Sequence, residues 1–357
     1  MSTFSGPIQL SNIYKPKIWG RRDLAPLFAM PSSRDGATGH FTQQRIGEVW
    51  VTDDVSRFMN GPAAGMTLAE ASQKYGPELH GKSWTGSRFP ILAKYIFTSD
   101  WLSVQVHPDD AYAAVHDPGN AGKCEMWYFL SADPDAAILL GLKPGVTQQQ
   151  LLPVFKNGTS RDLLQSFRPQ PEEAVFLPPG IVHALGPGLL LFEVEENSDL
   201  TYRLDDFGRP GLDGKPRPLH LKKGMEVIRP DLPPLRDLPR LEFKEAYGAR
   251  RFVLACRFFA LEELSVRHLA PFRSSPERVE VFSITEGAGR IENEAGWLGY
   301  RPGDTWLIPP AAGLYRVVPR TSTKLLKFYV PDMDRDFREP LKRHGAASDK
   351  IRQIVFE

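Results

Sequence analysis

The chain has 357 residues, of which 41% are hydrophobic and 24% charged, and its formal net charge is +1. These values are typical of a globular protein and exclude a disordered chain. The near-zero net charge, without any basic block, argues against nucleic acid or an anionic membrane surface as a partner. The length exceeds the size at which a single core stops growing, so two domains are expected.

The first twenty residues contain no basic segment followed by an apolar one, and no run is long enough to span a bilayer. Only two cysteines occur, Cys124 and Cys256, and they lie far apart in the sequence. A disulfide framework is therefore not expected, and the simplest location is the cytoplasm.

In chain order, residues 1–60 read as short strands and turns, with a clear strand at 46–51 (IGEVWV). Residues 66–78 predict a short helix, because Thr67 suits the N-cap and Glu70 follows three residues later. Residues 89–106 return to a strand pattern with a turn at 98–100. A helical turn is then expected from Pro108 onwards.

The middle of the chain continues the β pattern. MWYFLS and AAILLG predict two strands around a turn, and EAVFLPPGIVHALGPGLLLFEVEE predicts further strands with Pro/Gly corners. Residues 147–167 predict two short helices broken at Asn157 and Gly158. Short strands between Gly/Pro turns indicate a β-sandwich or barrel, with the helices as insertions.

A loop rich in Pro, Gly and Lys follows residue 206 and runs to about residue 239, where we expect the linker between domains. Beyond it comes a second series of strands. Its turn LIPPAAGLYRV repeats the shape of FLPPGIVHAL, but Leu314 stands where His183 would be. We therefore expect two similar β-barrels, of which only the first carries metal ligands, and a charged, partly helical end from residue 332.

The stretch LSVQVHPDD carries an unusual polar face. Gln105 and His107 are two residues apart in a run that favours a strand, so both side chains point to one face. Glu125 and His183 each stand beside another apolar run. One amide, two imidazoles and one carboxylate are a plausible shell for a borderline divalent ion such as zinc.

These motifs occur in a recognisable order: QVHPDD, then Lys123-x-Glu125, then PPGIVHA, then ENSDLTYRLDD. Together with WGRRDL, IGEVW and FPILAKYI nearer the start, they resemble the type I phosphomannose (mannose-6-phosphate) isomerases, zinc enzymes of the cupin fold, over roughly residues 10–215. The short interval between Glu125 and His183 resembles the short bacterial subgroup of that family.

The resemblance implies an all-β protein of two cupin-like barrels (jelly rolls) with short helical insertions. It places the catalytic metal-binding domain at residues 1–235 and a C-terminal cupin-like domain without metal ligands at residues 236–357. It also implies one Zn²⁺ per chain, a sugar phosphate as substrate, and a monomer or homodimer with no nucleic-acid or membrane partner.

Site residues follow from the same resemblance. Gln105, His107, Glu125 and His183 would ligate zinc, Arg203 and Glu193 would be catalytic, and the substrate would be met by Lys94, Lys123 and Ser103. Glu48, in the strand IGEVWV, faces either the cavity or water, and we include it as a substrate contact.

The chemistry of aldose–ketose isomerisation requires these residue types. An enediol intermediate gathers negative charge on oxygen, which a metal ion or a cation stabilises. Glu193, desolvated enough to raise its pKa, could move the proton between C1 and C2, although a metal-bound water or an imidazole is an alternative base. Arg203 lies ten residues after Glu193, and the two could come from adjacent strands facing one cavity.

Each residue also has a plainer explanation. Glu125 could pair with Lys123 on a solvated edge, Arg203 could form a surface ion pair with Asp205 or Asp206, and Lys94 could extend its ammonium group to water. Two other functions stay open, namely another metal-dependent cupin enzyme, such as a dioxygenase or a sugar epimerase, and a non-catalytic sugar-binding cupin. The cationic residues favour a phosphorylated substrate over the first, and Glu193 with Arg203 disfavours the second.

Overall fold

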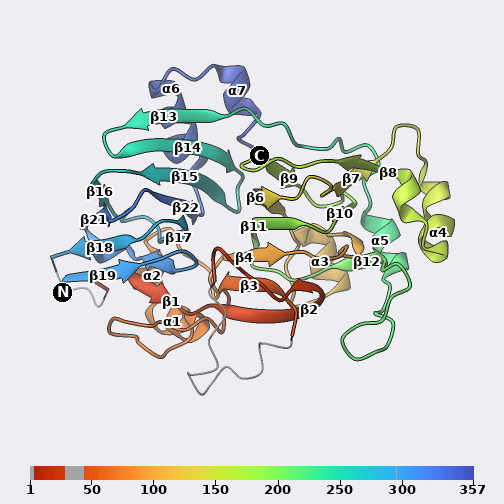
Figure 1. The fold of residues 1–357 in the computed structure, drawn as a ribbon, viewed down its shortest axis with the longest axis horizontal. Helices are drawn as coiled ribbons and strands as arrows, with labels where there is room; N and C mark the ends of the chain where they lie inside the picture. Colours follow the sequence, from red (N-terminus) through yellow and green to blue (C-terminus); the bar gives the residue numbers. More distant parts are fainter. Residues whose placement is uncertain (1–3, 29–43, 295) are drawn as a thin grey trace.

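A computed structural model describes residues 4–28, 44–294 and 296–357 of the chain. It is mostly β, with four antiparallel sheets (Figure 1). Two sheets come from the N-terminal part of the chain and two from the C-terminal part, as the alternation of short strands and Gly/Pro turns predicts.

The N-terminal part forms a six-stranded and a five-stranded sheet. In spatial order, the larger sheet contains β2 (Ile13–Arg21), β3 (Ile46–Thr52), β4 (Ile91–Phe97), β11 (Leu189–Glu196), β6 (Glu125–Ala132) and β9 (Ala174–Leu177). The smaller contains β12 (Tyr202–Asp205), β5 (Val104–Val106), β10 (His183–Leu185), β7 (Ile138–Leu142) and β8 (Leu164–Phe167).

The C-terminal part forms a four-stranded sheet and, together with the N-terminal strand β1, a seven-stranded sheet. The larger contains β1 (Ile8–Leu10), β20 (Thr305–Ile308), β17 (Glu280–Glu286), β22 (Thr323–Tyr329), β15 (Ala260–Val266), β14 (Gly248–Ala255) and β13 (Leu241–Glu245). The smaller contains β16 (Ala270–Arg273), β21 (Leu314–Pro319), β18 (Gly289–Asn293) and β19 (Gly296–Tyr300).

Strand order repeats between the two parts. Reading β9-β6-β11-β4-β3-β2 in the first large sheet and β20-β17-β22-β15-β14-β13 in the second gives the same connectivity, with β1 added at the edge of the second. The smaller sheets correspond in the same way, β5-β10-β7-β8 with β16-β21-β18-β19. His183 begins β10 and Leu314 begins β21, so the two proline-bearing turns lead into corresponding strands.

The six-stranded sheet is buried on both faces. Toward the five-stranded sheet it contributes Trp127 and Leu191 to one apolar cluster. Toward the seven-stranded sheet it contributes Tyr95 and Phe192 to another, and the Phe192 and Phe328 rings lie 5.6 Å apart. A sheet covered on both faces explains why β4 is apolar except for Lys94 and why β11 begins with four consecutive apolar residues.

The helical segments cover edges and ends. They are α1 (Leu68–Tyr75), α2 (Pro77–His80), α3 (Asp110–His116), α4 (Gln148–Asn157), η1 (Ser160–Leu163), α5 (Leu221–Val227), η2 (Pro310–Ala312), η3 (Met333–Arg338), α6 (Glu339–Arg343) and α7 (Ser348–Arg352). Helix α1 begins with the predicted capping box between Thr67 and Glu70. Among the described residues, no helix is both long and apolar enough to cross a membrane.

Two sequence expectations need correction. The second helix predicted within residues 147–167 is the short 3₁₀ turn η1, after which the chain enters β8, because Leu164–Phe167 pairs with β7. The expected linker between residues 206 and 239 is not wholly irregular, because it contains α5, whose Gly224 packs closely against Leu204.

The C-terminal segment packs on the body of the protein beside β13 (Figure 1). Leu341 on α6 and Ile351 on α7 are buried in the core cluster that includes Phe252 of β14. Although this segment is rich in charged residues, it has an apolar face that packs against the core.

We predict that Leu341→Ala lowers the free energy of unfolding by about 2–5 kcal/mol, because it leaves a cavity under α6. Leu219→Ala, at a leucine that is 42% exposed, serves as the control and should change stability by less than about 0.5 kcal/mol. Urea titration of both variants measures the difference. Equal stability of the two variants would mean that the C-terminal segment contributes nothing to the folded state.

Candidate metal centre

One row of residues crosses the five-stranded sheet. His183 on β10 lies opposite Gln105 on β5, which in turn lies opposite Arg203 on β12. Residues opposite each other on antiparallel strands share a face, so the three side chains start from the same side of the sheet. His107 follows two residues after Gln105 and is placed on that side by the alternation of the strand.

A second set of polar side chains faces this row from the six-stranded sheet. Lys94 on β4 lies opposite Glu193 on β11, and Glu193 lies opposite Trp127 on β6. Two residues further along β11, Glu195 lies opposite Glu125 of β6. Strand β11 thus carries two carboxylates on one face. Lys94 of β4 and Glu125 of β6 lie beside them.

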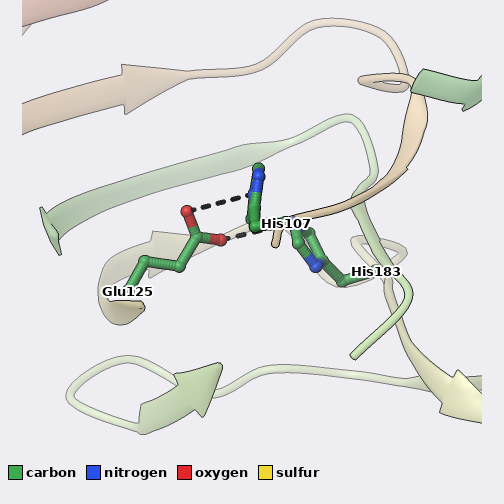
Figure 2. A group of neighbouring side chains, drawn as sticks. All are labelled: His107, Glu125 and His183. Carbon is green, nitrogen blue, oxygen red and sulfur yellow. Dashed lines mark ion pairs between the residues drawn. The ribbon is translucent and has the colours of Figure 1, made fainter. Parts of the chain in front are cut away.

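His107, Glu125 and His183 converge between the two sheets (Figure 2). The Nε2 atom of His107 lies 3.5 Å from Glu125 Oε2, and the Nε2 atom of His183 lies 3.3 Å from Glu125 Oε1. All three side chains are buried.

Hydrogen bonds fix which nitrogen of each imidazole carries the proton. Nδ1 of His107 lies 2.9 Å from the carbonyl oxygen of Leu200, and Nδ1 of His183 lies 3.0 Å from that of Ile181. A carbonyl only accepts, so Nδ1–H donates in both rings and each Nε2 carries a lone pair. Burial lowers the pKa of His107 well below its usual value and that of His183 to about 4, so both rings are neutral.

Both Nε2 lone pairs therefore face the carboxylate of Glu125. An ionised carboxylate has no proton to donate, so neither side of these contacts supplies a hydrogen. The Nε2 atom of His107 and Oε1 of Glu125 have no hydrogen-bond donor in the described part of the chain, while Oε2 of Glu125 forms an ion pair with Lys123 at 3.1 Å. Buried polar atoms are normally satisfied. Three sets of inward-facing acceptors fit a cation between them, and the two-nitrogen, one-carboxylate donor set suits zinc.

Gln105 lies at the edge of this group. Its Nε2 is 3.1 Å from Nε2 of His183, and its Oε1 accepts a hydrogen bond from Ser103 at 3.4 Å. In this orientation the amide donates to His183, and a half-turn of the amide group would present its oxygen to the centre instead. The position suits a fourth donor, and the ligand role of Gln105 stays a prediction.

Glu125 belongs to a cluster of five buried ionisable side chains, together with Lys94, Lys123, Glu193 and Glu195. Burial raises the pKa of Glu195 well above its usual value. Lys94 Nζ contacts Glu193 at 2.9 Å and Glu195 at 3.0 Å. Lys123 Nζ contacts Glu195 at 2.7 Å and Glu125 at 3.1 Å, and lies 3.9 Å from Glu193. Lys94 does not extend its ammonium group to water, because it is buried. Glu125 does pair with Lys123, but the pair is buried and does not lie on a solvated edge.

The carboxylates of this cluster differ in pKa. Burial raises the pKa of Glu125 to about 7, with a further contribution from the nearby Glu193. Burial also acts to raise the pKa of Glu193, but the ammonium groups of Lys94 and Lys123 outweigh it, and the pKa lies well below the usual value. The expectation that desolvation leaves Glu193 with a raised pKa is therefore wrong, and this carboxylate is ionised.

Arg203 is half-buried, and it is not on a strand adjacent to Glu193 as expected, because β11 and β12 belong to different sheets. One of its Nη atoms donates to the carbonyl oxygen of Pro218 at 3.0 Å, while its Nε has no partner among the described residues. Asp206 pairs with other arginines, Arg209 and Arg217. The alternative of an Arg203–Asp206 surface pair is therefore not observed.

The remaining predicted contacts lie on the inner faces of the sheets. Ser103 is buried beside Gln105. Glu48 is buried on the same face of β3 as Trp50, whose partner on β4 is Lys94. Its carboxylate accepts from Trp50 Nε1 at 2.6 Å and pairs with Lys17 at 3.0 Å.

Two site residues escaped the sequence analysis. Glu195 was detectable, because it stands two residues after Glu193 in FEVEE and strand alternation places both on one face. Trp127, which donates from Nε1 to Glu193 at 2.8 Å, carries no comparable signal, because a tryptophan in an apolar strand usually packs in the core.

A separate cavity of about 410 Å³ lies between residues 80–91 and strands β17 and β22, and none of its lining residues belongs to the cluster above. Its arginines are neutralised: Arg88 pairs with Asp54, and Arg278 and Arg335 pair with Asp336.

Comparison with known proteins identifies relatives. A family model described as "Phosphomannose isomerase type I, catalytic domain" matches residues 8–128. The mannose-6-phosphate isomerase ManA of Bacillus subtilis is 32% identical over 313 residues, covering 87% of this chain and 95% of its own.

Solved structures agree in fold. The crystal structure of the Bacillus subtilis mannose 6-phosphate isomerase matches with a TM-score of 0.79 and 26% identity, covering 90% of this chain and 99% of that one. A zinc-bound mannose 6-phosphate isomerase matches with a TM-score of 0.70 at 15% identity, covering 91% and 99%, and is alike in fold. The resemblance drawn from the motifs is thus confirmed, and the chain belongs to the type I phosphomannose isomerase family and is an enzyme of that family.

Proposed function

We propose that the protein interconverts mannose 6-phosphate and fructose 6-phosphate through an enediol intermediate. The observation that carries the proposal is the pair of imidazole lone pairs that face Glu125 next to two buried lysines. The names of the relatives support the choice of substrate. The five buried ionisable groups favour a polar, charged substrate over the apolar substrate of a dioxygenase.

His107, Glu125 and His183 would hold one zinc ion per chain, with Gln105 as a fourth ligand after its amide turns. The zinc-bound structural neighbour supports this choice of metal. Bound there, zinc would act as a Lewis acid toward the substrate oxygens on which enediolate charge develops.

Arg203, Lys94 and Lys123 would bind the anionic substrate. The Nε–H of Arg203 has no partner among the described residues, and its planar fork suits a phosphate or an enediolate oxygen. Each lysine ammonium has three N–H donors, and two of them face the carboxylates described above, so one remains for the sugar phosphate. Ser103 and Glu48 would complete the substrate contacts.

Glu193 would move the proton between C1 and C2 of the sugar. It is ionised, which is the form that accepts a proton, and Trp127 and Lys94 fix the orientation of its carboxylate. Groups held in this way need little rearrangement during the reaction.

For the whole chain, we propose two cupin-like barrels, a catalytic one at residues 1–235 and one without metal ligands at residues 236–357. The repeated strand order and the matching positions of His183 and Leu314 support this division. A cytoplasmic location and a monomeric or homodimeric state belong to the same proposal.

Chelation tests the metal dependence. In a coupled assay with mannose 6-phosphate, activity should disappear after treatment with a chelator and return when zinc is added, because the enediolate charge then has its Lewis acid again. Full activity of protein shown by elemental analysis to be metal-free would refute the role of the metal.

The ligand set can be tested at His107. His107→Ala should lose both bound zinc and isomerase activity, because it removes one of the two imidazole donors. His116→Ala, at an exposed histidine on α3, is the matched control and should keep its metal. Zinc content is measured by elemental analysis of the dialysed proteins, and stoichiometric zinc in His107→Ala would remove this residue from the shell.

Arg203→Ala should lower kcat by about 100-fold or more while leaving the zinc content unchanged, because it deletes a cation that stabilises developing negative charge. Arg209→Ala removes an arginine already engaged with Asp100 and Asp206 and serves as the control. Steady-state kinetics of the zinc-loaded variants give the comparison. Near-normal turnover of Arg203→Ala would show that its assignment is wrong.

A further inference from the structure

Glu195 occupies the centre of the cluster of five buried ionisable groups. Strand β11 places it on the same face as Glu193, and the register with β6 places it opposite Glu125. Its side chain is fully buried and contacts Lys94 Nζ at 3.0 Å and Lys123 Nζ at 2.7 Å.

The three carboxylates of the cluster share the two lysines unequally. Glu193 contacts Lys94 at 2.9 Å but lies 3.9 Å from Lys123. Glu125 contacts Lys123 at 3.1 Å and faces the imidazoles with both oxygens. Among the described residues, Glu195 is therefore the carboxylate that holds both ammonium groups within 3.0 Å.

Both ammonium groups need such an anchor. A lysine side chain is a flexible four-carbon stem with freely rotating donors, so its charge has no fixed position without a partner. The two like charges also repel each other. Burial and the Lys94 charge both act to lower the pKa of Lys123, but the carboxylates of Glu125 and Glu195 outweigh them and the pKa is raised. A carboxyl group in contact with both nitrogens fixes the distance between them and, when ionised, offsets this repulsion.

We propose that Glu195 is a positioning residue, which sets the places of Lys94 and Lys123 so that the remaining donor of each faces the sugar phosphate. This inference rests on the proposed isomerase function. In this role Glu195 acts through the lysines and is not a zinc ligand, although its carboxylate lies close enough to those of Glu125 and Glu193 for the zinc content to be the deciding control. Its loss should therefore weaken substrate binding and leave the zinc centre intact.

The next residue supplies a matched control. Glu196 is also buried, but it points to the opposite face of β11, where its Oε1 accepts a hydrogen bond from the backbone N–H of Cys124 at 3.2 Å. No ion pair joins it to Lys94 or Lys123 in the described part of the chain. Glu196→Gln makes the same chemical change one residue away and should leave substrate binding unchanged.

The experiment compares wild type, Glu195→Gln and Glu196→Gln after zinc loading. Elemental analysis gives the zinc content, steady-state kinetics give KM and kcat, and calorimetry gives the affinity for mannose 6-phosphate without relying on turnover. We expect Glu195→Gln to raise KM and to weaken binding by about tenfold, since charge-assisted hydrogen bonds of the lysines are lost. Zinc content should match wild type.

Three results would overturn the inference: binding by Glu195→Gln within twofold of wild type, loss of zinc from that variant, or equal weakening by Glu196→Gln. A purely structural role would lower the folded fraction and apparent kcat without moving KM. If Glu195→Gln fails to fold, Glu195→Asp replaces it, keeps the charge and should raise KM in the same direction by a smaller factor. An unchanged KM in Glu195→Asp would then count against the inference.

The proposed isomerase function can fail separately. Wild type that binds mannose 6-phosphate without converting it would contradict the isomerase activity. Weaker binding by Glu195→Gln would still support the positioning role in that case. Wild type that does not bind mannose 6-phosphate at all would overturn both.

Discussion

The feature on which the site depends is a set of acceptors that face one another. Two imidazoles donate their Nδ1 protons to backbone carbonyls and turn their Nε2 lone pairs toward the carboxylate of Glu125. Such an arrangement is unfavourable unless a cation lies between the groups. The backbone hydrogen bonds to Leu200 and Ile181 therefore fix the orientation of both imidazoles, as outer-shell partners commonly do in metal sites.

The cluster of ionisable groups next to this centre is subject to the same requirement, namely that buried polar groups need partners. Burying five ionisable groups together is costly, and only close pairing offsets the loss of hydration. Each ammonium group contacts two carboxylates, and Trp127 binds a further carboxylate oxygen. The result is a buried cluster of paired ionisable groups, which is the kind of environment in which electrostatic stabilisation of a reaction is strong.

The C-terminal part of the chain matters to this surface although it lacks metal ligands. Strand β11 carries Glu193 and Glu195 on one face, while Phe192 and Val194 on the other face belong to the core shared with the seven-stranded sheet. A hydrogen bond between Tyr95 and Ser283 at 2.7 Å adds a polar link across the same interface. The seven-stranded sheet thus packs against β11, the strand that carries Glu193 and Glu195.

The sequence by itself determined the β character, the capped helix at Thr67, the shared face of Gln105 and His107, and, through ordered motifs, the family. These features depend on local periodicity and on the identity of residues close together in the chain. The structure alone decided that β12 pairs with β5 and not with β11, that Glu195 joins both lysines, and that Glu193 is held ionised. Those outcomes depend on register between distant strands and on which charges burial brings together, and residue spacing along the chain does not encode either.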